Sequence, residues 1–380
     1  PTGMVWPPSV RGILVTEGVR GEGGRLTNNE NKRFMFDYVP EMFMGDHAET
    51  IEEADQWVEE VVSGKLATVR RPPELLTRDV VAKAIKAEVE AGRGSPHGGA
   101  FLDISHRGEE AIKKKLPSMY HQFMELAEVD ITKDPMEVGP TAHYVMGGIR
   151  VNASTQETTV PGLYACGEAA SGLHGANRLG GNSLSDLITF GKRAGEYAAK
   201  SSKSLEQPIL DESEIQSAIK QMLSPLENQN GENPGQIYDE MRDMMQQKVG
   251  IIRQKEELEE AIEELNSFKQ RAVKSSSGTS RTYNSGWHQA LDLHNMADVS
   301  VACALAALTR EESRGGHTRQ DMPEPEDDYW GKHINIIWME NDEIKIRQEE
   351  VEPMSEELQS VIAEVKDMIA KRAEEQGGSA

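Results

Sequence analysis

The stretch that decides the fold runs from Thr141 to Lys200 and reads TAHYVMGGIRVNASTQETTVPGLYACGEAASGLHGANRLGGNSLSDLITFGKRAGEYAAK. Its apolar segments His143–Ile149 and Gly162–Ala165 are expected to form strands. A glycine-rich turn then leads into a helix over Leu184–Ala199, as in α/β architectures where strand ends and a helix start face a ligand.

The expected start of that helix is Gly180-Gly181-Asn182-Ser183. Asn182 or Ser183 can serve as its N-cap. Because the first backbone N–H groups of a helix lack partners, such a start can receive an anion. Many α/β folds contain a similar turn, so this pattern alone is a weak indication of a site.

The composition predicts a soluble globular protein with two or three domains: 380 residues, 37% hydrophobic and 28% charged. The net charge of −23 argues against a nucleic-acid partner, because phosphates would be repelled. Many acids lie in helical-looking stretches such as Glu256–Glu264 and after Asp321, where solvated helix faces are the ordinary interpretation.

Only two cysteines, Cys166 and Cys303, are present. They exclude a disulfide framework or an iron–sulfur site built by this chain alone, and a reducing compartment fits. The sequence contains no run of 18 apolar residues and no visible signal peptide, so no membrane span is expected. Since the chain starts at Pro1 without Met, we expect a fragment whose N-terminal portion is missing.

Gly12–Gly24 is read as a short strand followed by a glycine-rich turn. Glu17 and Arg20 lie three apart in it, and spacing alone does not separate a surface ion pair from a functional pair. The chain contains neither a G-x-G-x-x-G fingerprint nor a Walker motif. The glycines instead allow close approach of backbone to a ligand or another strand.

Thr77 is expected to cap a helix that runs to Glu90. Arg78 then lies in the first turn, where a cation opposes the helix dipole. This local conflict suggests a role beyond helix support; a salt bridge to Asp79 or to a remote acid is the alternative. Before this helix, Glu41–Lys65 is acidic and amphipathic and predicts a surface helix or insertion.

The remaining chain predicts a mixed α+β and α/β multidomain protein. The methionines around Met241 are expected to fill a core. His288 and His294 are expected to make ordinary polar contacts, and no metal site is predicted. The other expected elements are a strand at Ala100–Ile104, a helix over Glu109–Leu126 split by Pro117, mostly helix over Asp211–Lys274 with an Asp211/Glu214 capping box, a buried helix at Trp287–Ala307, a hairpin of Ile334–Met339 and Ile344–Val351 turning at Asn341-Asp342, and a last helix at Glu356–Arg372.

Seven motifs, in this order and spacing, carry a family resemblance. They are LVTEGVRGEGG from Leu14, TRDVV from Thr77, HYVMGGIRVN from His143, VPGLYACGEA from Val160, HGANRLGGNSL from His174, MMQQKVGIIR from Met244 and ESRGGHTRQDMP from Glu312. Together they closely resemble the flavoprotein subunit of succinate dehydrogenase and fumarate reductase. L-aspartate oxidase and adenylylsulfate reductase share the scaffold, but the HGANRLGGNSL form is more similar to the dicarboxylate branch.

The resemblance implies four regions: residues 1–140 as part of a capping domain, 141–203 as the C-terminal part of an FAD-binding domain, 208–310 as a helical domain and 311–380 as a C-terminal domain. It also implies that the other half of the FAD-binding domain, and a histidine before Pro1, are missing. We therefore expect that these residues alone neither bind FAD tightly nor catalyse. The segment between Arg20 and Arg78 is long for the family.

The implied activity is the FAD-dependent interconversion of succinate and fumarate. By position in the family motifs, Thr16, His143 and Arg178 would bind the dicarboxylate; an arginine can grip a carboxylate with two parallel hydrogen bonds. Without the resemblance, Arg178 would be read as part of a structural salt bridge.

The resemblance assigns Arg78 to proton transfer, with Glu17 and Arg20 as the relay to solvent. Arginine is a poor base because it is almost always protonated, so its residue type does not predict this role and only the match to the family motif implies it.

For the cofactor, Glu168 matches the acid on the FAD ribose, with a capped strand-end acid as the alternative. Ser183 and Leu184 match positions against the flavin ring, where the positive helix end can stabilise negative charge.

The implied partners are a separate iron–sulfur subunit, which takes the electrons, and through it a membrane anchor that handles quinone, with the flavoprotein on the cytoplasmic, inner face of the membrane. Two alternatives stay open. The chain could be another enzyme of the scaffold, such as L-aspartate oxidase, or a non-enzymatic acidic scaffold. The scaffold alternative predicts that Arg78, His143 and Arg178 do not converge.

Overall fold

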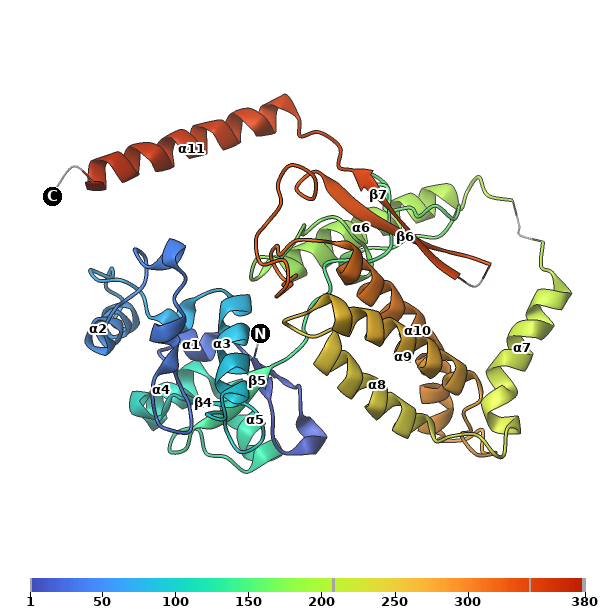
Figure 1. Ribbon diagram of the computed structural model, residues 1–380, viewed down its shortest axis with the longest axis horizontal. Helices are drawn as coiled ribbons and strands as arrows, with labels where there is room; N and C mark the ends of the chain where they lie inside the picture. Colours follow the sequence, from blue (N-terminus) through green and yellow to red (C-terminus); the bar gives the residue numbers. More distant parts are fainter. Residues whose placement is uncertain (1, 207–208, 342, 378–380) are drawn as a thin grey trace. The chain divides into compact units, whose positions relative to one another are not determined.

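The computed structural model describes residues 2–206, 209–341 and 343–377 (Figure 1). The chain divides into two compact units, Pro1–Leu210 and Asp211–Ala380. Each is described by itself below. The finer domain limits expected at residues 140, 203 and 310 stay predictions.

A five-stranded sheet is the centre of the first unit, with the order β2-β1-β5-β4-β3. Every adjacent pair is antiparallel, and Thr2 pairs with Val15 on one side and with Pro140 on the other. Burial alternates along β4, where Ala100 and Leu102 face the core, as in a sheet with one covered face. The strands are β1 (Thr2–Met4), β2 (Leu14–Val15), β3 (Arg25–Thr27), β4 (Ala100–Asp103) and β5 (Met136–Pro140).

Helix α3 (Arg78–Glu90) contributes to the core of this sheet through Val81 and Ile85, both almost fully buried. The predicted break at Pro117 is confirmed, since α4 ends before it and α5 begins at it. In the acidic segment before α3, the only α-helix among the described residues is α2 (Ile51–Val62), where the hydroxyl of Thr50 caps the helix by accepting from Glu53 N–H at 3.2 Å. The other helices of the unit are α1 (Gly18–Gly21), α2 (Ile51–Val62), α4 (Glu109–Lys115), α5 (Pro117–Ala127) and α6 (Asn182–Ser201), with short 3-10 helices at Pro8–Val10, Phe34–Tyr38, Glu41–Phe43, Pro73–Leu75, Ser105–Arg107 and Gly167–Ala169.

The two strands predicted in the opening stretch do not form. In their place are isolated bridges, Ile149 with Ala170 and Glu157 with Tyr164. A strand needs a neighbour to satisfy its backbone groups, and the described residues supply only these single contacts. Gly148, at φ +153°, also leaves no room for a side chain against Ala169. The segment is an ordered loop held by hydrogen bonds such as Ile149 N–H to the Ala169 carbonyl at 2.8 Å.

Of the two predicted caps, the one for α6 was wrong and the one for α3 is confirmed in position only. Gly181 (φ +83°) is the N-cap of α6, and Asn182 already belongs to the helix. Glycine takes this position because the left-handed conformation costs it nothing. Thr77 does cap α3 by position, but its side chain accepts no hydrogen bond from the helix.

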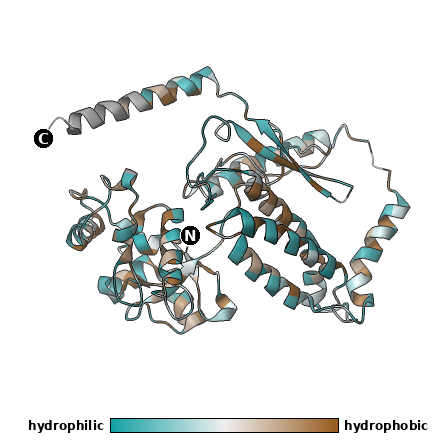
Figure 2. Cartoon of the chain, viewed as in Figure 1, coloured by the Kyte–Doolittle hydropathy of each residue, from teal (hydrophilic) through white to brown (hydrophobic). Residues whose placement is uncertain are grey.

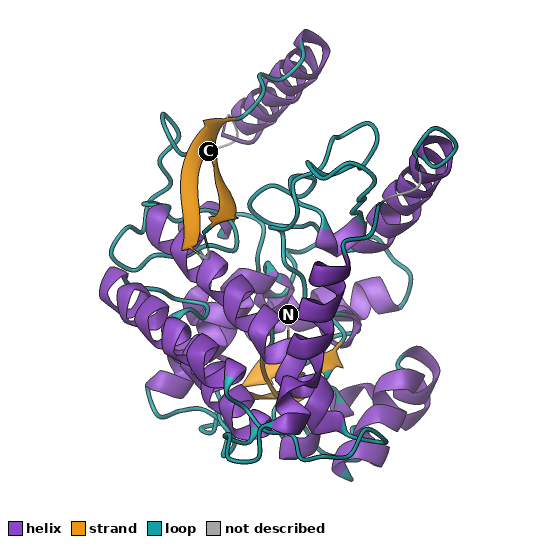
Figure 3. Ribbon diagram, turned by 90° about the vertical axis from the view of Figure 1, so that its right-hand side faces the viewer, coloured by secondary structure: helices purple, strands orange, loops and turns teal. Residues whose placement is uncertain are grey.

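The second unit is mainly helical, and its core lies where α8, α9 and α10 meet. Met241 and Met244 are buried there, as predicted, beside Leu258 and Leu265. Figure 2 shows apolar residues along α10, and Figure 3 shows the helices as the main component of the chain. The helices are α7 (Glu212–Glu227), α8 (Pro234–Lys248), α9 (Lys255–Val273) and α10 (Ser285–Thr309).

Helix α10 is, among the described residues, the one helix long and apolar enough to cross a membrane by length and composition. Core helices of soluble proteins meet the same test, and here Leu293, Ala297 and Ala304 are buried against the neighbouring helices. The helix was predicted to be the buried one of a bundle, and its packing agrees.

Side-chain caps fix the starts of α7 and α10. Asp211 accepts from Ser213 N–H at 2.7 Å, and Asn284 accepts from Trp287 N–H at 3.0 Å. Such caps satisfy backbone donors that have no partner in the helix. The sequence predicted Asp211 in this role.

A hairpin of β6 (His333–Glu340) and β7 (Glu343–Glu350) follows, and α11 (Glu356–Gly377) ends the described chain. The predicted hairpin is confirmed; Asp342 of its predicted turn lies outside the described residues. Asn335 joins the hairpin to α10 by donating to the Ala306 carbonyl at 3.0 Å.

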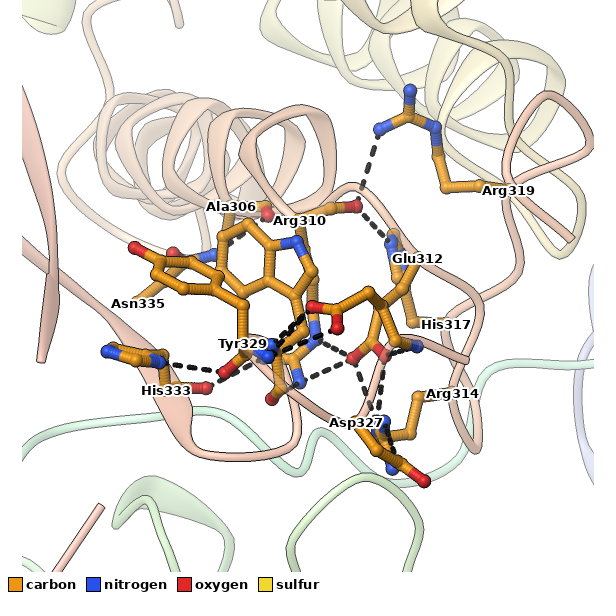
Figure 4. A network of polar contacts seen from close by, with 12 residues as sticks. Ala306, Arg310, Glu312, Arg314, His317, Arg319, Asp327, Tyr329, His333 and Asn335 are labelled. Carbon is orange, nitrogen blue, oxygen red and sulfur yellow. Dashed lines mark hydrogen bonds and ion pairs between the residues drawn. The ribbon is translucent and has the colours of Figure 1, made fainter. Parts of the chain in front are cut away.

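A polar network lies at the C-terminal end of α10 (Figure 4). The carboxylate of Glu312 is fully buried and accepts from Arg310 Nε at 2.8 Å and from Arg314 Nε at 2.9 Å. The guanidinium of Arg319, also buried, donates to the Ala307 and Leu308 carbonyls at 3.2 and 2.9 Å. These charged groups therefore satisfy one another and the last carbonyls of the helix.

Candidate active site

Arg78 points from the first turn of α3 to Glu17, which lies just before α1. Its Nε donates to Glu17 Oε2 at 2.8 Å. This remote acid, and not Asp79, resolves the local conflict that the sequence predicted for a cation at a helix start. The Arg78 side chain is 27% exposed and that of Glu17 40% exposed. A pair this open to water contributes about 1 kcal/mol or less to stability.

Arg20 is the second arginine close to the Glu17 carboxylate. Its Nη2 lies 3.6 Å from Glu17 Oε1, and its Nη1 donates to the Glu74 carbonyl at 2.5 Å. The side chain is 2% exposed, and its Nε has no hydrogen-bond partner among the described residues. The ion pair is thus buried at the arginine and open to solvent at the acid.

The electrostatics of this chain keep Glu17 charged. Burial alone would raise the pKa of Glu17, but the hydrogen bond from Arg78 and the charges of Arg20 and Arg78 outweigh it and lower that pKa. Burial, the largest effect on Arg20, lowers the pKa of its guanidinium, and the nearby charge of Arg78 lowers it further. The arrangement is a carboxylate shared by two arginines, one of them desolvated.

Arg178 lies in the loop before α6 and is 8% exposed. Its guanidinium carbon is 4.6 Å from the centre of the Tyr144 ring, a distance at which a cation is attracted to an aromatic face. Its Nη1 donates to the Leu179 carbonyl at 3.1 Å, while its buried Nε has no partner among the described residues. No acid pairs with it there, so the structural salt bridge considered for Arg178 is not seen in the described part of the chain.

The loop before α6 also meets α3. A Cβ built on Gly180 would lie 3.6 Å from Nη2 of Arg78, so the guanidinium of Arg78 reaches the backbone two residues after Arg178. His143 is exposed on the loop after β5; partial burial of its ring and then the positive charges of Arg178 and Arg78 lower its pKa. The structure therefore brings Arg78 to the loop that carries Arg178, and His143 lies near enough for both charges to act on it.

Thr16 stands beside this group at the end of β2 and is exposed. Its hydroxyl accepts from Gly18 N–H at 3.3 Å, which leaves its own proton to be donated elsewhere. Because Thr16 directly precedes Glu17 in the sequence, it lies close to the ion pairs that Glu17 makes with Arg78 and Arg20.

The three residues assigned to the cofactor are on and beside α6. Glu168 is exposed, and Oε1 accepts from Val145 N–H at 2.9 Å. The side chain of Leu184 is 68% exposed, and Ser183 is half-buried in the first turn. Nothing lies within 4 Å of a Cβ built on Gly181, so the helix start opens onto free space.

This donor set fits FAD. Glu168 has a second oxygen that can accept from ribose hydroxyls, α6 begins without a side-chain cap, and Leu184 offers an apolar surface to a ring. The close approach of Gly167 to Leu187, where a Cβ would be 2.4 Å away, fixes the short helix that carries Glu168 against α6.

Sequence reasoning missed Asp186 and Tyr144. Asp186, 5% exposed, accepts from the Tyr144 hydroxyl at 2.8 Å and lies 3.2 Å from Nε2 of His174. The available signal was an acid in the second turn of the helix that begins at the site. Among the described residues no cluster of His, Cys, Asp and Glu could hold a metal ion.

Comparison with known proteins gives family matches in two parts of the chain. Residues 1–184 match a family model described as an FAD binding domain, and residues 238–365 match one described as Fumarate reductase flavoprotein C-term. The chain belongs to the family of succinate dehydrogenase and fumarate reductase flavoprotein subunits. The cofactor of this family is FAD, as the motifs implied.

Several curated relatives are similar. A fumarate reductase (CoM/CoB) subunit of Methanothermobacter marburgensis is 40% identical, over 85% of this chain and 53% of that protein. The succinate dehydrogenase flavoprotein subunit of Coxiella burnetii is 35% identical, over 90% of this chain and 55% of that protein. This chain thus spans about half the length of the curated relatives it matches.

Solved structures agree. Mycobacterium smegmatis Sdh1 in complex with UQ1 gives a TM-score of 0.73 at 48% identity, covering 93% of this chain and 54% of that one. A quinol-fumarate reductase with menaquinol molecules gives 0.79 at 32% identity, covering 93% and 59%. Adenylylsulfate reductase of Archaeoglobus fulgidus, at 16% identity and a TM-score of 0.61, shares the fold alone.

Proposed function

We propose that this flavoprotein chain takes part in the FAD-dependent interconversion of succinate and fumarate, with Arg78 as the residue that exchanges a proton with the substrate. The observation that carries the proposal is the position of Arg78. It is hydrogen-bonded to Glu17 on one side and lies against the backbone of Gly180 on the other, next to Arg178 in sequence. A non-enzymatic scaffold gives no reason for these cations to converge.

Arg178 and His143 are the proposed anchors for the dicarboxylate. The unpartnered Nε–H of Arg178 is available to a carboxylate oxygen, and a charged hydrogen bond of this kind is among the stronger ones in proteins. A dianion would also offset the repulsion between the guanidinium groups of Arg78 and Arg178. Thr16, with a hydroxyl proton free to donate, is the proposed third contact.

Arg78 is the proposed proton carrier at the substrate carbon, and Glu17 and Arg20 are the proposed relay. When succinate is oxidised, one C–H bond gives a hydride and the neighbouring C–H bond gives a proton. Bound FAD supplies the acceptor for the hydride. Arg78 takes that proton on its guanidinium as its Nε gives a proton to the Glu17 carboxylate, 2.8 Å away, so the guanidinium stays protonated throughout. Glu17, 40% exposed, connects the relay to water. Reduction of fumarate uses the same steps in reverse.

The test is substitution of Arg78 in the FAD-loaded holoenzyme. Arg78→Lys keeps the charge but loses the planar group that bonds Glu17 through Nε, and Arg78→Ala loses both. We expect turnover of succinate and of fumarate to fall by at least about 10³-fold, since general acid–base groups contribute about 10²–10⁴-fold and this residue also orients the relay. FAD content, measured by absorbance, should not change.

Arg242→Lys, an exposed arginine of the second unit that pairs with Asp239, is the matched control and should turn over normally. Substantial turnover by Arg78→Ala would remove Arg78 from the proposed role. Comparing succinate with L-aspartate as substrates of the unsubstituted enzyme separates the proposal from an L-aspartate oxidase.

For partners, we propose a separate iron–sulfur subunit that takes the electrons onward and a peripheral position on the inner face of the cytoplasmic membrane. Solved neighbours named as complexes with UQ1 and menaquinol support a quinone-linked assembly. The relative named fumarate reductase (CoM/CoB) supports a second candidate for the electron partner. Supplying the purified enzyme with reduced quinone analogues or with the CoM/CoB pair, and following fumarate consumption, distinguishes the two.

A further inference from the structure

The buried carboxylate of Asp186 is not used by the proposed reaction. It lies in the second turn of α6 and is 5% exposed. The Tyr144 hydroxyl donates to its Oδ2 at 2.8 Å, and His174 Nε2 lies 3.2 Å from the same oxygen and 3.2 Å from the Tyr144 hydroxyl. The rings of Tyr144 and His174 meet edge to face, with centroids 5.2 Å apart. One carboxylate thus fixes two aromatic rings from two different loop segments.

The Tyr144 ring is in turn the surface on which the Arg178 guanidinium lies, at 4.6 Å. Arg178 is held from one face by this ring and at one edge by the Leu179 carbonyl, and its buried Nε–H has no partner in the described part of the chain. An unsatisfied buried donor costs free energy, so the group is arranged for a partner that arrives separately.

We propose that Asp186 is a positioning residue: by anchoring Tyr144 and His174, it sets the orientation in which Arg178 meets a carboxylate of the substrate. This inference rests on the proposed function, since it takes Arg178 as the dicarboxylate anchor.

The interposed tyrosine has a chemical advantage over a direct ion pair. A carboxylate bonded to Arg178 itself would occupy the donors that a substrate carboxylate needs and would cancel the positive charge. Through the tyrosine, Asp186 fixes the ring while the arginine keeps its charge and its free N–H. Burial, followed by the hydrogen bond to Asp186, raises the pKa of Tyr144 to about 12, so the hydroxyl keeps its proton and stays a donor to the acid.

The competing explanation is that Asp186 only stabilises the loop. A purely structural role would change the unfolding temperature, or the FAD content, without a specific change in the affinity for dicarboxylates. A positioning role changes KM for succinate and fumarate, and the dissociation constant of the unreactive dicarboxylate malonate, while FAD stays bound.

The experiment compares Tyr144→Phe, Asp186→Asn and the double variant in the FAD-loaded holoenzyme. Tyr144→Phe keeps the ring under Arg178 and removes only the hydroxyl. Asp186→Asn keeps an acceptor and removes the charge. Tyr197→Phe, a tyrosine further along α6 whose ring faces Lys200, is the matched control. The readouts are FAD content, the thermal unfolding midpoint, kcat and KM, and malonate binding followed by the flavin absorbance spectrum.

We expect KM and the malonate dissociation constant to rise about 10-fold in each single variant, the size of one lost hydrogen bond to a charged group, with a smaller fall in kcat. In the double variant, KM and the malonate dissociation constant should rise no further than in the more affected single variant, because both changes remove the same contact. Tyr197→Phe should match the unsubstituted enzyme.

Two results would overturn the inference. Unchanged malonate affinity in both single variants, with Arg178→Lys binding malonate much more weakly, would show that Arg178 anchors the ligand without help from Asp186; the proposed function would then stand. Absence of malonate binding and of succinate turnover in the unsubstituted holoenzyme would instead refute the proposed function, and this inference with it.

Discussion

The two carboxylate oxygens of Glu17 each face one arginine, and these two arginines determine the protonation state of Glu17. The Nε of Arg78 binds one oxygen and the Nη2 of Arg20 approaches the other. Both cations favour the charged carboxylate, which is why the pKa of Glu17 is lowered in spite of partial burial. A relay acid held in this way accepts a proton only briefly and returns it to water.

This geometry predicts a pH dependence. Because its folded-state pKa lies below the ordinary value of 4.5, Glu17 stays charged at neutral pH, and its stabilising contribution is lost only as the pH falls through that lowered pKa. We expect Glu17→Gln to lower kcat at pH 7 by about 10²-fold, the low end for an acid–base group, with little change in KM. Steady-state kinetics from pH 5 to 9 measures this.

Glu22→Gln, an acid of the same turn without a described partner in the relay, is the control for the change in charge. A fall in kcat equal in the two variants would mean that net charge, and not the relay, matters.

At the residue scale, the motifs predicted members of the site but not how they touch. Glu17 and Arg78 are 61 positions apart, and only the fold brings them to 2.8 Å. The acid that satisfies Arg78 therefore could not be chosen from spacing. Asp186 was missed because its partners, Tyr144 and His174, lie 42 and 12 positions away in the sequence.

Among the elements, the contact between β4 and β5 is unusually close at one point. A Cβ on Gly99, just before β4, would lie 2.3 Å from the carbonyl oxygen of Val138 in β5 and 3.2 Å from a methyl group of Val5. Backbone cannot yield as a flexible side chain can. Glycine at 99 thus sets how closely these strands pack.

Gly99→Ala should therefore destabilise the first unit by about 1–3 kcal/mol, the usual cost of forcing an extra methyl group into a packed site. Urea unfolding followed by circular dichroism measures the change. Gly45→Ala is the control, because nothing lies within 4 Å of a Cβ there and its φ is ordinary. An unfolding free energy for Gly99→Ala equal to that of Gly45→Ala would contradict the close contact.

Elements with a clear period or a strong breaker were predictable, and those that depend on neighbours were not. The break at Pro117, the helix from Arg78 and the hairpin around Asn341 follow from local chemistry. The strands expected at His143–Ile149 and Gly162–Ala165 are apolar enough, but pairing partners decide whether an apolar segment is a strand. The described residues provide only single bridges there.

For the molecule as a whole, the second unit contains a histidine that folding keeps neutral. His317 Nδ1 accepts from Arg253 Nη1 at 2.7 Å, because arginine can only donate. Its Nε2 donates to the Arg310 carbonyl at 3.1 Å, a contact drawn in Figure 4. Burial and then the charge of Arg253 lower the pKa of His317 to about 4. In the unfolded chain its pKa is about 6.5.

The second unit should consequently lose stability as the pH falls from about 6.5 to about 4, because only the unfolded state takes up the proton in that window. Thermal unfolding of the whole chain at several pH values should show this as a transition that moves to lower temperature. His317→Gln, which cannot be protonated, should make that shift smaller. An identical shift in the variant and the unsubstituted chain would contradict the assignment.

The order of strands in the first unit has a consequence for the way the chain is made. β5, the middle strand, is the last of the five to leave the ribosome, and Thr2 pairs with Pro140. Until Met136–Pro140 is available, β1 with β2 and β3 with β4 are two separate ribbons with open edges. Contacts this distant in sequence are slow to form, and open strand edges invite aggregation. The nascent chain therefore lacks the strand that joins these two ribbons until more than a hundred further residues have been synthesised.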